Sequence, residues 1–299
     1  MPQPVLIIGA MKCGTSALYR ALVEHPDVAG PREKELDFFI EEGNWARGVT
    51  WYESHFRAGT RVWCEASPTY TTAPYFAGVP ERVAAILPDA RLIYVVRDPV
   101  DRIISHYLHC VAAHQERRPF GEVIGRLHLE KEDIEAGPQT SFVADRFPDL
   151  LPHQRFHAYL ARSMYMYQAT RWLEHFDRSD ILVLTQAQLL REPEALRTVG
   201  DFMGIDLQDA APERRHVTAD KRRMSNIGNA LRDSRAGRRL RRSVLRDALI
   251  RVARPILYTR LPDVSVSNDE REYILSLLKE DADAFAGAFG VDVMNRTRG

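Results

Sequence analysis

The sequence of 299 residues contains little cysteine and no excess of charge of either sign. Its three cysteines, Cys13, Cys64 and Cys110, are an odd and sparse set, which excludes a disulfide framework and predicts reduced thiols. Lysine plus arginine and aspartate plus glutamate each number 41, so the overall charge favours no nucleic acid partner. Any site for a polyanion must therefore be local.

Long apolar runs are absent as well. Apolar runs such as those at residues 5–8 and 92–96 are far shorter than the roughly 20 residues that cross a bilayer. The N-terminus has no basic stretch followed by the apolar segment that a secretory signal requires. We therefore expect a cytoplasmic protein. Its 45% of hydrophobic and 27% of charged residues are typical of a globular chain with a full core.

Two kinds of hydrophobic pattern alternate along the chain. Short β-branched runs predict buried strands at residues 5–8, 61–65, 92–96 and 181–184. Segments of helical period predict helices at 15–24, 79–87, 100–114, 164–176 and 269–289. No linker or repeat divides the chain, so the alternation predicts one α/β domain over residues 1–299, with a mostly parallel β-sheet flanked by helices. Ligands of such sheets bind at the carboxyl ends of the strands.

Two segments depart from this alternation. Residues 115–160 contain several prolines and glycines with weak periodicity, which predicts a loop-rich insertion near the ligand site. Residues 212–254 contain fourteen arginines or lysines and four acidic residues, a local charge of about +10. Part of this stretch, residues 235–254, mixes leucine and arginine at near-helical spacing. It is either a peripheral membrane contact, a surface for an anionic or lipid-linked ligand, or a solvated helix face.

The first predicted strand leads directly into a glycine-containing loop, residues 9–16, and then into a helix. Small residues, backbone N–H groups and a helix N-terminus make such a loop a phosphate or sulfate site, although a glycine turn is also common in any α/β protein. In a Walker A loop the lysine follows the second glycine, whereas Lys12 precedes Gly14 by two residues. The strand at 92–96 ends in Arg97 and not in a metal-binding aspartate, so ATP with Mg²⁺ is disfavoured.

A second anion site is predicted after the strand at 92–96. Arg97 stands at its carboxyl end, a proline opens the next helix, and Ser105 follows eight residues later. A guanidinium and a helix hydroxyl in this arrangement can hold an anionic group at a distance from the first loop. Two such sites suit a nucleotide with two separate phosphates. The alternative is a structural ion pair between Arg97 and Asp98, with Ser105 only facing a crossover helix.

Together these motifs resemble the family of sulfotransferases that use 3′-phosphoadenosine 5′-phosphosulfate (PAPS), in particular its heparan sulfate N- and 3-O-sulfotransferase-like branch, which includes bacterial members. Residues 12–18 resemble the family's 5′-phosphosulfate loop, and Arg97 with Ser105 resembles its 3′-phosphate pair. Residues 34–39 resemble the Lys-Glu-x-x-Phe-Phe segment that carries the catalytic glutamate. The resemblance covers residues 4–205 and extends to Trp51, Tyr52, Phe56, the segment 65–70, Tyr165 and Trp172.

The resemblance implies a P-loop-like sulfotransferase fold and transfer of a sulfuryl group from PAPS to a hydroxyl or amine, with no metal required. Glu35 is then the base, and Lys12 meets the charge on the leaving oxygen. The cofactor-binding residues that it implies are Lys12, Cys13, Gly14, Thr15, Ser16, Ala17, Arg97, Ser105 and Tyr165, the last beside the adenine. Two features depart from the family. Ala66 stands where the heparan enzymes usually have lysine, and a 3′-phosphate loop with Lys-Gly is not evident, so that Lys221, Arg222 and Arg223 are the candidates for its role.

Several alternatives stay open on the sequence alone. Glu35 lies in a charged run that is either solvated or packed at a cleft edge, where burial would raise the pKa of a carboxylate. His106, His109, Cys110 and His114 share one face of the predicted helix, so they offer a conceivable zinc site and, in His106 or His109, a reserve base. Cys13 stands at a predicted helix N-terminus beside Lys12, a position that can favour a thiolate, but the resemblance gives it no chemical role, so we expect a residue that packs within the loop.

The sequence leaves the acceptor open among a small molecule, a glycan and a lipid-linked compound, and the oligomeric state unknown. Arginine outnumbers lysine by 36 to 5, which is typical of a GC-rich bacterial genome. The competing functions are an ATP-dependent phosphotransferase and a non-enzymatic, membrane-associated nucleotide-binding adaptor.

Overall fold

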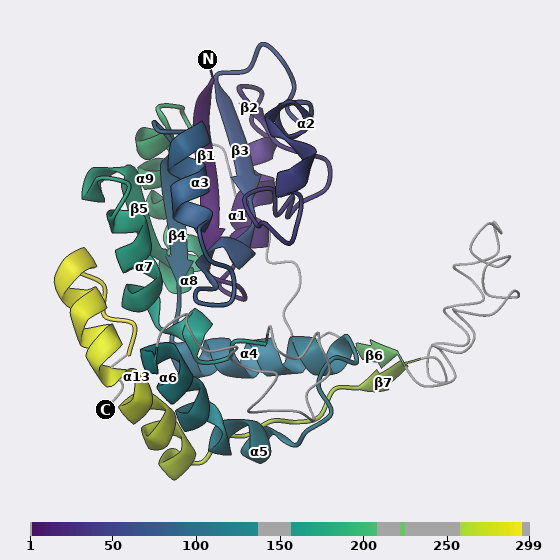
Figure 1. Ribbon diagram of the computed structural model, residues 1–299, viewed down its shortest axis with the longest axis vertical. Coiled ribbons are helices and arrows are strands. Elements are labelled where there is room, and N and C mark those ends of the chain that lie inside the picture. Colours follow the sequence, from purple (N-terminus) through teal and green to yellow (C-terminus); the bar gives the residue numbers. More distant parts are fainter. Residues whose placement is uncertain (1, 137–156, 208–221, 225–257, 295–299) are drawn as a thin grey trace, which may run out of the picture.

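The computed structural model describes residues 2–136, 157–207, 222–224 and 258–294 (Figure 1). A five-stranded parallel sheet in the order β2-β3-β1-β4-β5 forms its centre. Its strands are β1 (Gln3–Gly9), β2 (Val28–Ala29), β3 (Val62–Ala66), β4 (Arg91–Val96) and β5 (Ile181–Thr185). This architecture confirms the prediction of a single α/β domain with a parallel sheet and flanking helices.

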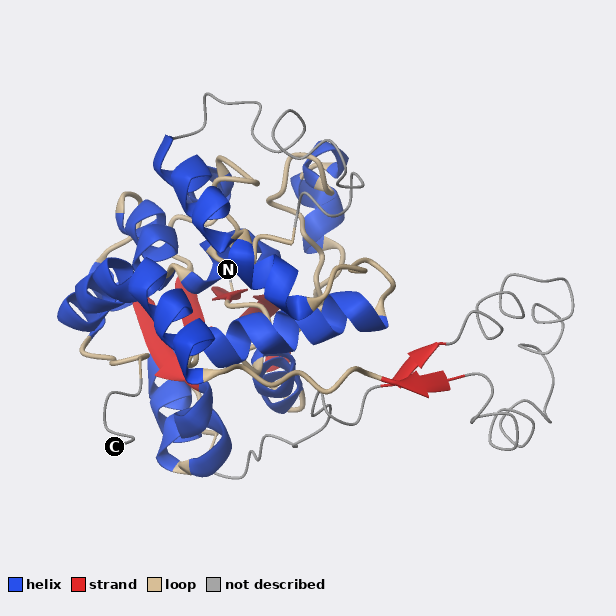
Figure 2. Cartoon of the chain, turned by 90° about the horizontal axis from the view of Figure 1, so that it is seen from below, coloured by secondary structure: helices blue, strands red, loops and turns tan. Residues whose placement is uncertain are grey.

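Helices cover the sheet and extend beyond it. The α-helices are α1 (Thr15–Val23), α2 (Val49–Glu53), α3 (Val79–Ile86), α4 (Pro99–Ala112), α5 (Phe120–Gly125), α6 (Leu127–Ala136), α7 (Tyr165–Leu173), α8 (Gln186–Arg191), α9 (Glu194–Met203) and α13 (Asn268–Phe289). The 3₁₀ turns of the described residues are η1 (Trp45–Arg47), η2 (Pro68–Thr71), η4 (Ala161–Ser163) and η5 (Arg178–Asp180). A separate antiparallel ribbon of β6 (Arg222–Met224) and β7 (Tyr258–Arg260) lies next to α4, apart from the sheet (Figures 1 and 2).

The four predicted strands are present to within about two residues. The sequence missed β2 because two residues are too few to show a period. The expectation of a loop-rich insertion at 115–160 is wrong for its described part, which contains α5 and α6. Pro119 explains the error, because it stands directly before α5, where a proline suits a helix start. Residues 137–156 lie outside the described part of the chain.

Two apolar clusters hold the domain together. The larger surrounds the sheet, and the smaller packs α4, α5, α6 and η4 together. The helix α13 joins them, because Ile274 and Leu278 belong to the smaller cluster while Phe285 and Phe289 belong to the larger. Figure 1 shows α13 lying along α6 and α7. The C-terminal helix therefore braces the two halves of the domain against each other.

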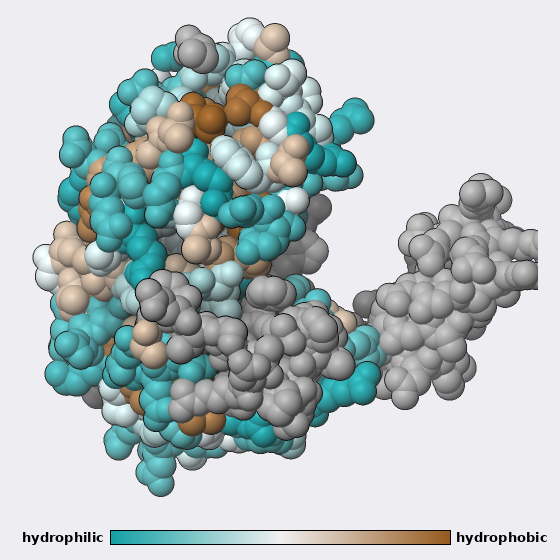
Figure 3. Space-filling model, viewed as in Figure 1, coloured by the Kyte–Doolittle hydropathy of each residue, from teal (hydrophilic) through white to brown (hydrophobic). Residues whose placement is uncertain are grey.

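The hydropathy of the surface and of the helices can be described separately. On the face shown in Figure 3, apolar residues form small separate patches among hydrophilic ones. Among the described residues, no helix is both long and apolar enough to span a membrane.

Candidate active site

The phosphate loop, residues 9–16, connects β1 to α1 at the carboxyl edge of the sheet. Gly14 has a φ of 98°, a left-handed conformation that glycine adopts without steric cost. Gly9 is needed for a different reason, since a Cβ there would collide with Thr71 Oγ1 on η2. Lys12 is also left-handed, with a φ of 72°. The chain therefore turns sharply between the strand and the helix, as the sequence predicted.

The loop offers several groups to an anion. The helix α1 leaves the N–H groups at its start without intrahelical acceptors and carries partial positive charge there. Ser16 is exposed and Lys12 is half-buried, whereas Cys13, Thr15 and Ala17 are buried. Lys12 and Ser16 are therefore the polar side chains of the loop that a ligand can reach, and the amides around Gly14 complete the cradle.

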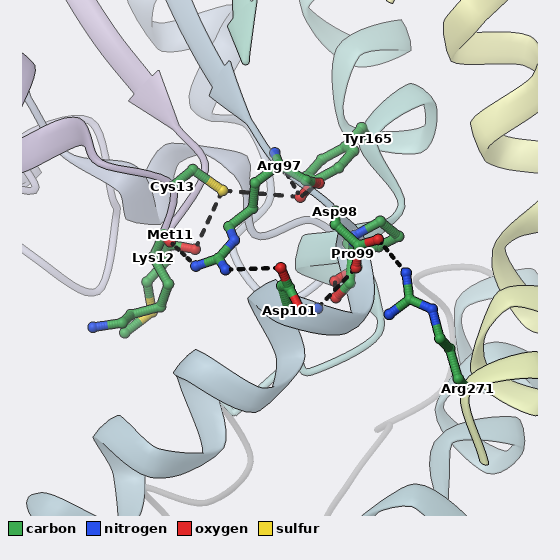
Figure 4. A network of polar contacts seen from close by, with 10 residues as sticks. Met11, Lys12, Cys13, Arg97, Asp98, Pro99, Asp101, Tyr165 and Arg271 are labelled. Carbon is green, nitrogen blue, oxygen red and sulfur yellow. Dashed lines mark hydrogen bonds and ion pairs between the residues drawn. The ribbon is translucent and has the colours of Figure 1, made fainter. Parts of the chain in front are cut away.

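Arg97 faces the phosphate loop from the end of the neighbouring strand β4 (Figure 4). Its Nη1 donates to the carbonyl oxygen of Lys12 at 3.4 Å, and its Nη2 lies 3.2 Å from Asp101 Oδ2. The figure shows the Lys12 side chain extending away from this guanidinium. Two cationic side chains therefore flank the loop from different directions, which suits a ligand with more than one anionic group.

Tyr165, the first residue of α7, ties these elements together. Its hydroxyl donates to the carbonyl oxygen of Arg97 at 2.9 Å and lies 3.9 Å from Cys13 Sγ (Figure 4). The ring is 1% exposed and is enclosed by Tyr94 and Phe285. Tyr165 thus fixes the backbone of Arg97 against the phosphate loop, while its contact with an adenine stays a prediction.

Glu35 lies on the segment between β2 and η1. Its side chain is 48% exposed and its Oε1 lies 2.6 Å from Lys34 Nζ, so the charged run is partly solvated. The two phenylalanines of the motif, Phe38 and Phe39, are fully buried and anchor the segment. Burial, and next the nearby Glu35 carboxylate, raises the pKa of Asp37 to about 6. The segment therefore carries two neighbouring carboxylates, one exposed and one largely buried.

Comparison with known proteins decides the family. The model of the sulfotransferase domain matches residues 2–245. The chain belongs to the sulfotransferase-domain family.

Curated relatives and a solved structure agree with this assignment. The bifunctional heparan sulfate N-deacetylase/N-sulfotransferase 1 of Xenopus laevis is 31% identical over 214 residues, which cover 67% of this chain and 22% of that protein. The heparan sulfate glucosamine 3-O-sulfotransferase 5 of Mus musculus is 26% identical over 203 residues, covering 67% and 53%. The chain thus spans about a fifth of the first relative and half of the second. A sulfotransferase structure from Alicyclobacillus acidocaldarius has a TM-score of 0.65 at 23% identity, over 98% of this chain and 97% of that one, and shares the fold.

The alternative interpretation of Arg97 was a structural ion pair with Asp98. The structure shows an ion pair of Arg97, but with a different aspartate. Arg97 pairs with Asp101, whereas Asp98 accepts from the backbone N–H of Asp101 at 2.9 Å and pairs with Arg271 on α13. Asp98 is therefore the N-cap of α4 and the anchor of the C-terminal helix, not the partner of Arg97. Ser105 is buried on α4, eight residues beyond Arg97.

The residues of the histidine face predicted on α4 differ in burial, and one of them lies beyond the helix. His106 and Cys110 are buried, His109 is half-buried, and His114 lies beyond the helix end with a φ of 59°. Burial, with the Arg102 guanidinium, holds the pKa of His106 well below its usual range, and its Nδ1 lies 3.4 Å from Arg102 Nη1. Within the described ranges, no three His, Cys, Asp or Glu side chains are placed to share a metal ion.

Two site residues escaped the sequence analysis as functional candidates, Arg162 and Asp37. Arg162 on η4 is 7% exposed, its Nη1 contacts Met11 Sδ of the phosphate loop, and its Nε has no hydrogen-bond partner in the described structure. Burial lowers its pKa to about 10, and the carboxylates of Asp37 and Glu35 oppose that shift. Asp37 Oδ1 is likewise buried without a partner. The sequence signal for Arg162 was a single arginine in a largely apolar stretch. The signal for Asp37 was a second carboxylate two residues after Glu35.

The structure describes only part of the two departures from the family, which are Ala66 and the basic residues proposed for the missing 3′-phosphate loop. Ala66 ends β3, where it is buried and paired with Ile7 of β1. Arg222 and Arg223 belong to the ribbon strand β6, of which only the backbone is described. Lys221 and the whole of the basic part at 235–254 lie outside the described residues.

Cys13 is fully buried, as expected of a residue that packs within the loop. Burial raises the pKa of Cys13 to about 11, an effect that the nearby Arg102 only partly offsets. Cys64 and Cys110 are also buried, and burial raises the pKa of each thiol.

We therefore expect the native protein to show no thiol that reacts rapidly with 5,5′-dithiobis(2-nitrobenzoate) at pH 8. In guanidinium chloride all three thiols of the chain should react at once, because unfolding exposes them. A single fast thiol in the native protein that disappears in a Cys13→Ala variant would contradict this account of the loop.

A buried carboxylate, Glu65, lies behind the Glu35 segment at the end of β3. It is 0% exposed and accepts hydrogen bonds from Ser67 Oγ at 2.5 Å, Tyr70 OH at 2.8 Å and Tyr52 OH at 3.2 Å. Burial raises its pKa from 4.5 to about 7, against the effect of these three donors.

This raised pKa predicts a pH-dependent term in stability. The folded protein holds the Glu65 proton more tightly than the unfolded chain, so the stabilisation is full below about pH 4.5 and is lost as the pH rises through about 7. Denaturant unfolding of the wild type and of Glu65→Gln at pH 5 and pH 8 tests it. The variant should gain stability relative to the wild type at pH 8, and a difference that is the same at both pH values would contradict the prediction.

Proposed function

We propose that this sulfotransferase transfers a sulfuryl group from PAPS to a hydroxyl or amine of a glycan and releases adenosine 3′,5′-bisphosphate. The observation that carries the proposal is the meeting of the phosphate loop and Arg97 at the carboxyl ends of adjacent parallel strands, with Arg97 Nη1 3.4 Å from the Lys12 carbonyl oxygen. One anion cradle and one separate guanidinium match a nucleotide that carries a 5′-phosphosulfate and a 3′-phosphate.

The residues present supply the three functions that the displacement needs. The acceptor atom attacks sulfur, the bond between sulfur and the 5′-phosphate oxygen breaks, and the acceptor loses a proton. Glu35, whose side chain is about half exposed, takes that proton. Lys12 stabilises the negative charge that develops on the leaving oxygen, and the amides of the phosphate loop hold the 5′-phosphate.

We propose that the reaction requires no metal. A sulfuryl group carries less charge than a phosphoryl group, so amides and a few cations can replace the metal that phosphoryl transfer uses. Lys12 and Arg97 flank the phosphate loop (Figure 4), and the buried Arg162 contacts the loop at Met11.

The relatives support a glycan as the acceptor class, because the two that we compare are named for heparan sulfate. Ala66 argues for an acceptor other than heparan sulfate itself, since the heparan enzymes usually have lysine there. The cytoplasmic location expected from the sequence is part of this proposal, and cell fractionation tests it.

The experiment is a transfer assay with ³⁵S-labelled PAPS in the presence of EDTA. The acceptors are N-deacetylated heparosan, chitosan oligosaccharides and, as a non-glycan arm, a simple phenol. We expect label in a glycan arm and equal rates with EDTA and with Mg²⁺. Transfer from [γ-³²P]ATP that needs Mg²⁺, with no transfer from PAPS, would contradict the proposal and favour the phosphotransferase.

A further inference from the structure

We propose that Glu65 is a positioning residue for Glu35, acting through the hydroxyls of Ser67 and Tyr70 on the segment at residues 35–39. The inference rests on the proposed function, because it gives a fixed position to the exposed carboxylate of Glu35, the base of that function.

The contacts form two parallel relays from one buried carboxylate. Ser67 Oγ donates to Glu65 Oε1 at 2.5 Å and accepts from the backbone N–H of Asp37 at 3.1 Å. Tyr70 OH donates to the same Oε1 at 2.8 Å and accepts from the backbone N–H of Phe39 at 3.4 Å. Each hydroxyl has a single hydrogen, so donating it to Glu65 leaves a lone pair for the segment. The carboxylate thus fixes the direction of both hydroxyls.

The segment needs this support because its own backbone is strained. Glu35 has a φ of 68° and Asp37 a φ of 46°, left-handed values that are uncommon for residues other than glycine. Such conformations persist only where the surrounding structure holds them. Because Glu35 itself is about half exposed, its place depends on how firmly its neighbours in the chain are held.

The protein contains a matched control for this idea. Tyr52 OH also donates to Glu65, to Oε2 at 3.2 Å, and Tyr52 is as buried as Tyr70, at 2% and 3% exposed. Its ring stacks on Phe38 with centroids 4.6 Å apart, a contact that phenylalanine retains. Among the described residues its hydroxyl meets only Glu65. Tyr52→Phe therefore removes a hydrogen bond from the same carboxylate without cutting a relay to the segment.

The test compares Ser67→Ala and Tyr70→Phe with Tyr52→Phe at pH 8. Hydrogen exchange of the peptide covering residues 35–40 reports the anchoring whether or not the protein turns over PAPS. We expect exchange about fivefold faster or more in the two relay variants, and unchanged exchange in Tyr52→Phe.

Measurements of turnover then test whether anchoring the segment matters for the function of Glu35 as the base. In the relay variants we expect kcat to fall about 10- to 100-fold, because a small displacement of a catalytic group is costly. Their dissociation constants for adenosine 3′,5′-bisphosphate should stay within about twofold of wild type, since the phosphate loop and Arg97 are untouched. Tyr52→Phe should keep wild-type kcat even if it loses stability.

Equal exchange in all three variants, or equal losses of kcat in Tyr70→Phe and Tyr52→Phe, would overturn the relay. A wild-type protein that never transfers sulfate, but whose exchange follows the expected pattern, would instead overturn the proposed function and leave the anchoring of the segment established.

Discussion

Replacing Glu35 by glutamine is expected to lower kcat by about 10²- to 10⁴-fold, the usual contribution of a general base. Glutamine keeps the shape of the side chain but cannot accept the acceptor's proton. Because Glu35 is on the segment between β2 and η1, and not in the phosphate loop, affinity for adenosine 3′,5′-bisphosphate should stay close to wild type. Initial rates with labelled PAPS and calorimetric titration with the bisphosphate measure the two quantities separately.

Glu33→Gln is the control for this substitution, because Glu33 belongs to the same charged run and is exposed. It should retain wild-type turnover. If Glu35→Gln lost bisphosphate binding together with turnover, Glu35 would have a folding role. If it kept most of its turnover, the base would be another group, and His106→Ala would then be the variant to assay.

Substitution of Lys12 by methionine is expected to lower kcat by about 10²- to 10³-fold, as for the removal of one donor that meets transition-state charge. Methionine keeps the unbranched stem and removes the ammonium. Since the negative charge on the leaving oxygen develops only during the transfer, kcat should fall more than the affinity for PAPS. Steady-state rates at saturating PAPS, with the affinity for PAPS measured separately, test whether kcat falls more than the affinity.

Lys279→Met provides the comparison, because Lys279 is an exposed lysine of α13 that pairs with Asp283. Its kcat should equal that of the wild type. A Lys12→Met enzyme with unchanged kcat and weakened donor binding would show that Lys12 binds the ground state only, contrary to its proposed role.

Much of the site could be predicted because its signals are local. β-branched runs mark the strands, and the position of Lys12 relative to Gly14 is a property of one loop. Arg97 was placed correctly at a strand end because the strand itself was recognised. The carboxyl ends of adjacent parallel strands meet at one edge, so two local motifs were enough to bring the phosphate loop and Arg97 together.

The contacts that the sequence could not give are long-range. Asp98 pairs with Arg271, which is 173 residues away, so no local period reveals that Arg97 has a different partner. The burial of Cys13, which raises the pKa of its thiol although it stands at a helix N-terminus, depends on packing against Tyr165 from α7. Arg162 approaches Met11 across 151 residues, and neither stretch alone indicates the pairing.

Calorimetric titration of the wild type and an Arg97→Ala variant with adenosine 3′,5′-bisphosphate, and with ATP plus Mg²⁺, tests the central claim most directly because it needs no acceptor. We predict that the wild type binds the bisphosphate more tightly than ATP, in EDTA as well as in Mg²⁺. Loss of a charged hydrogen-bond donor should weaken bisphosphate binding about 10- to 150-fold in the variant. Tighter binding of ATP with Mg²⁺, together with an Arg97→Ala variant that binds the bisphosphate like the wild type, would contradict the two-anion donor site.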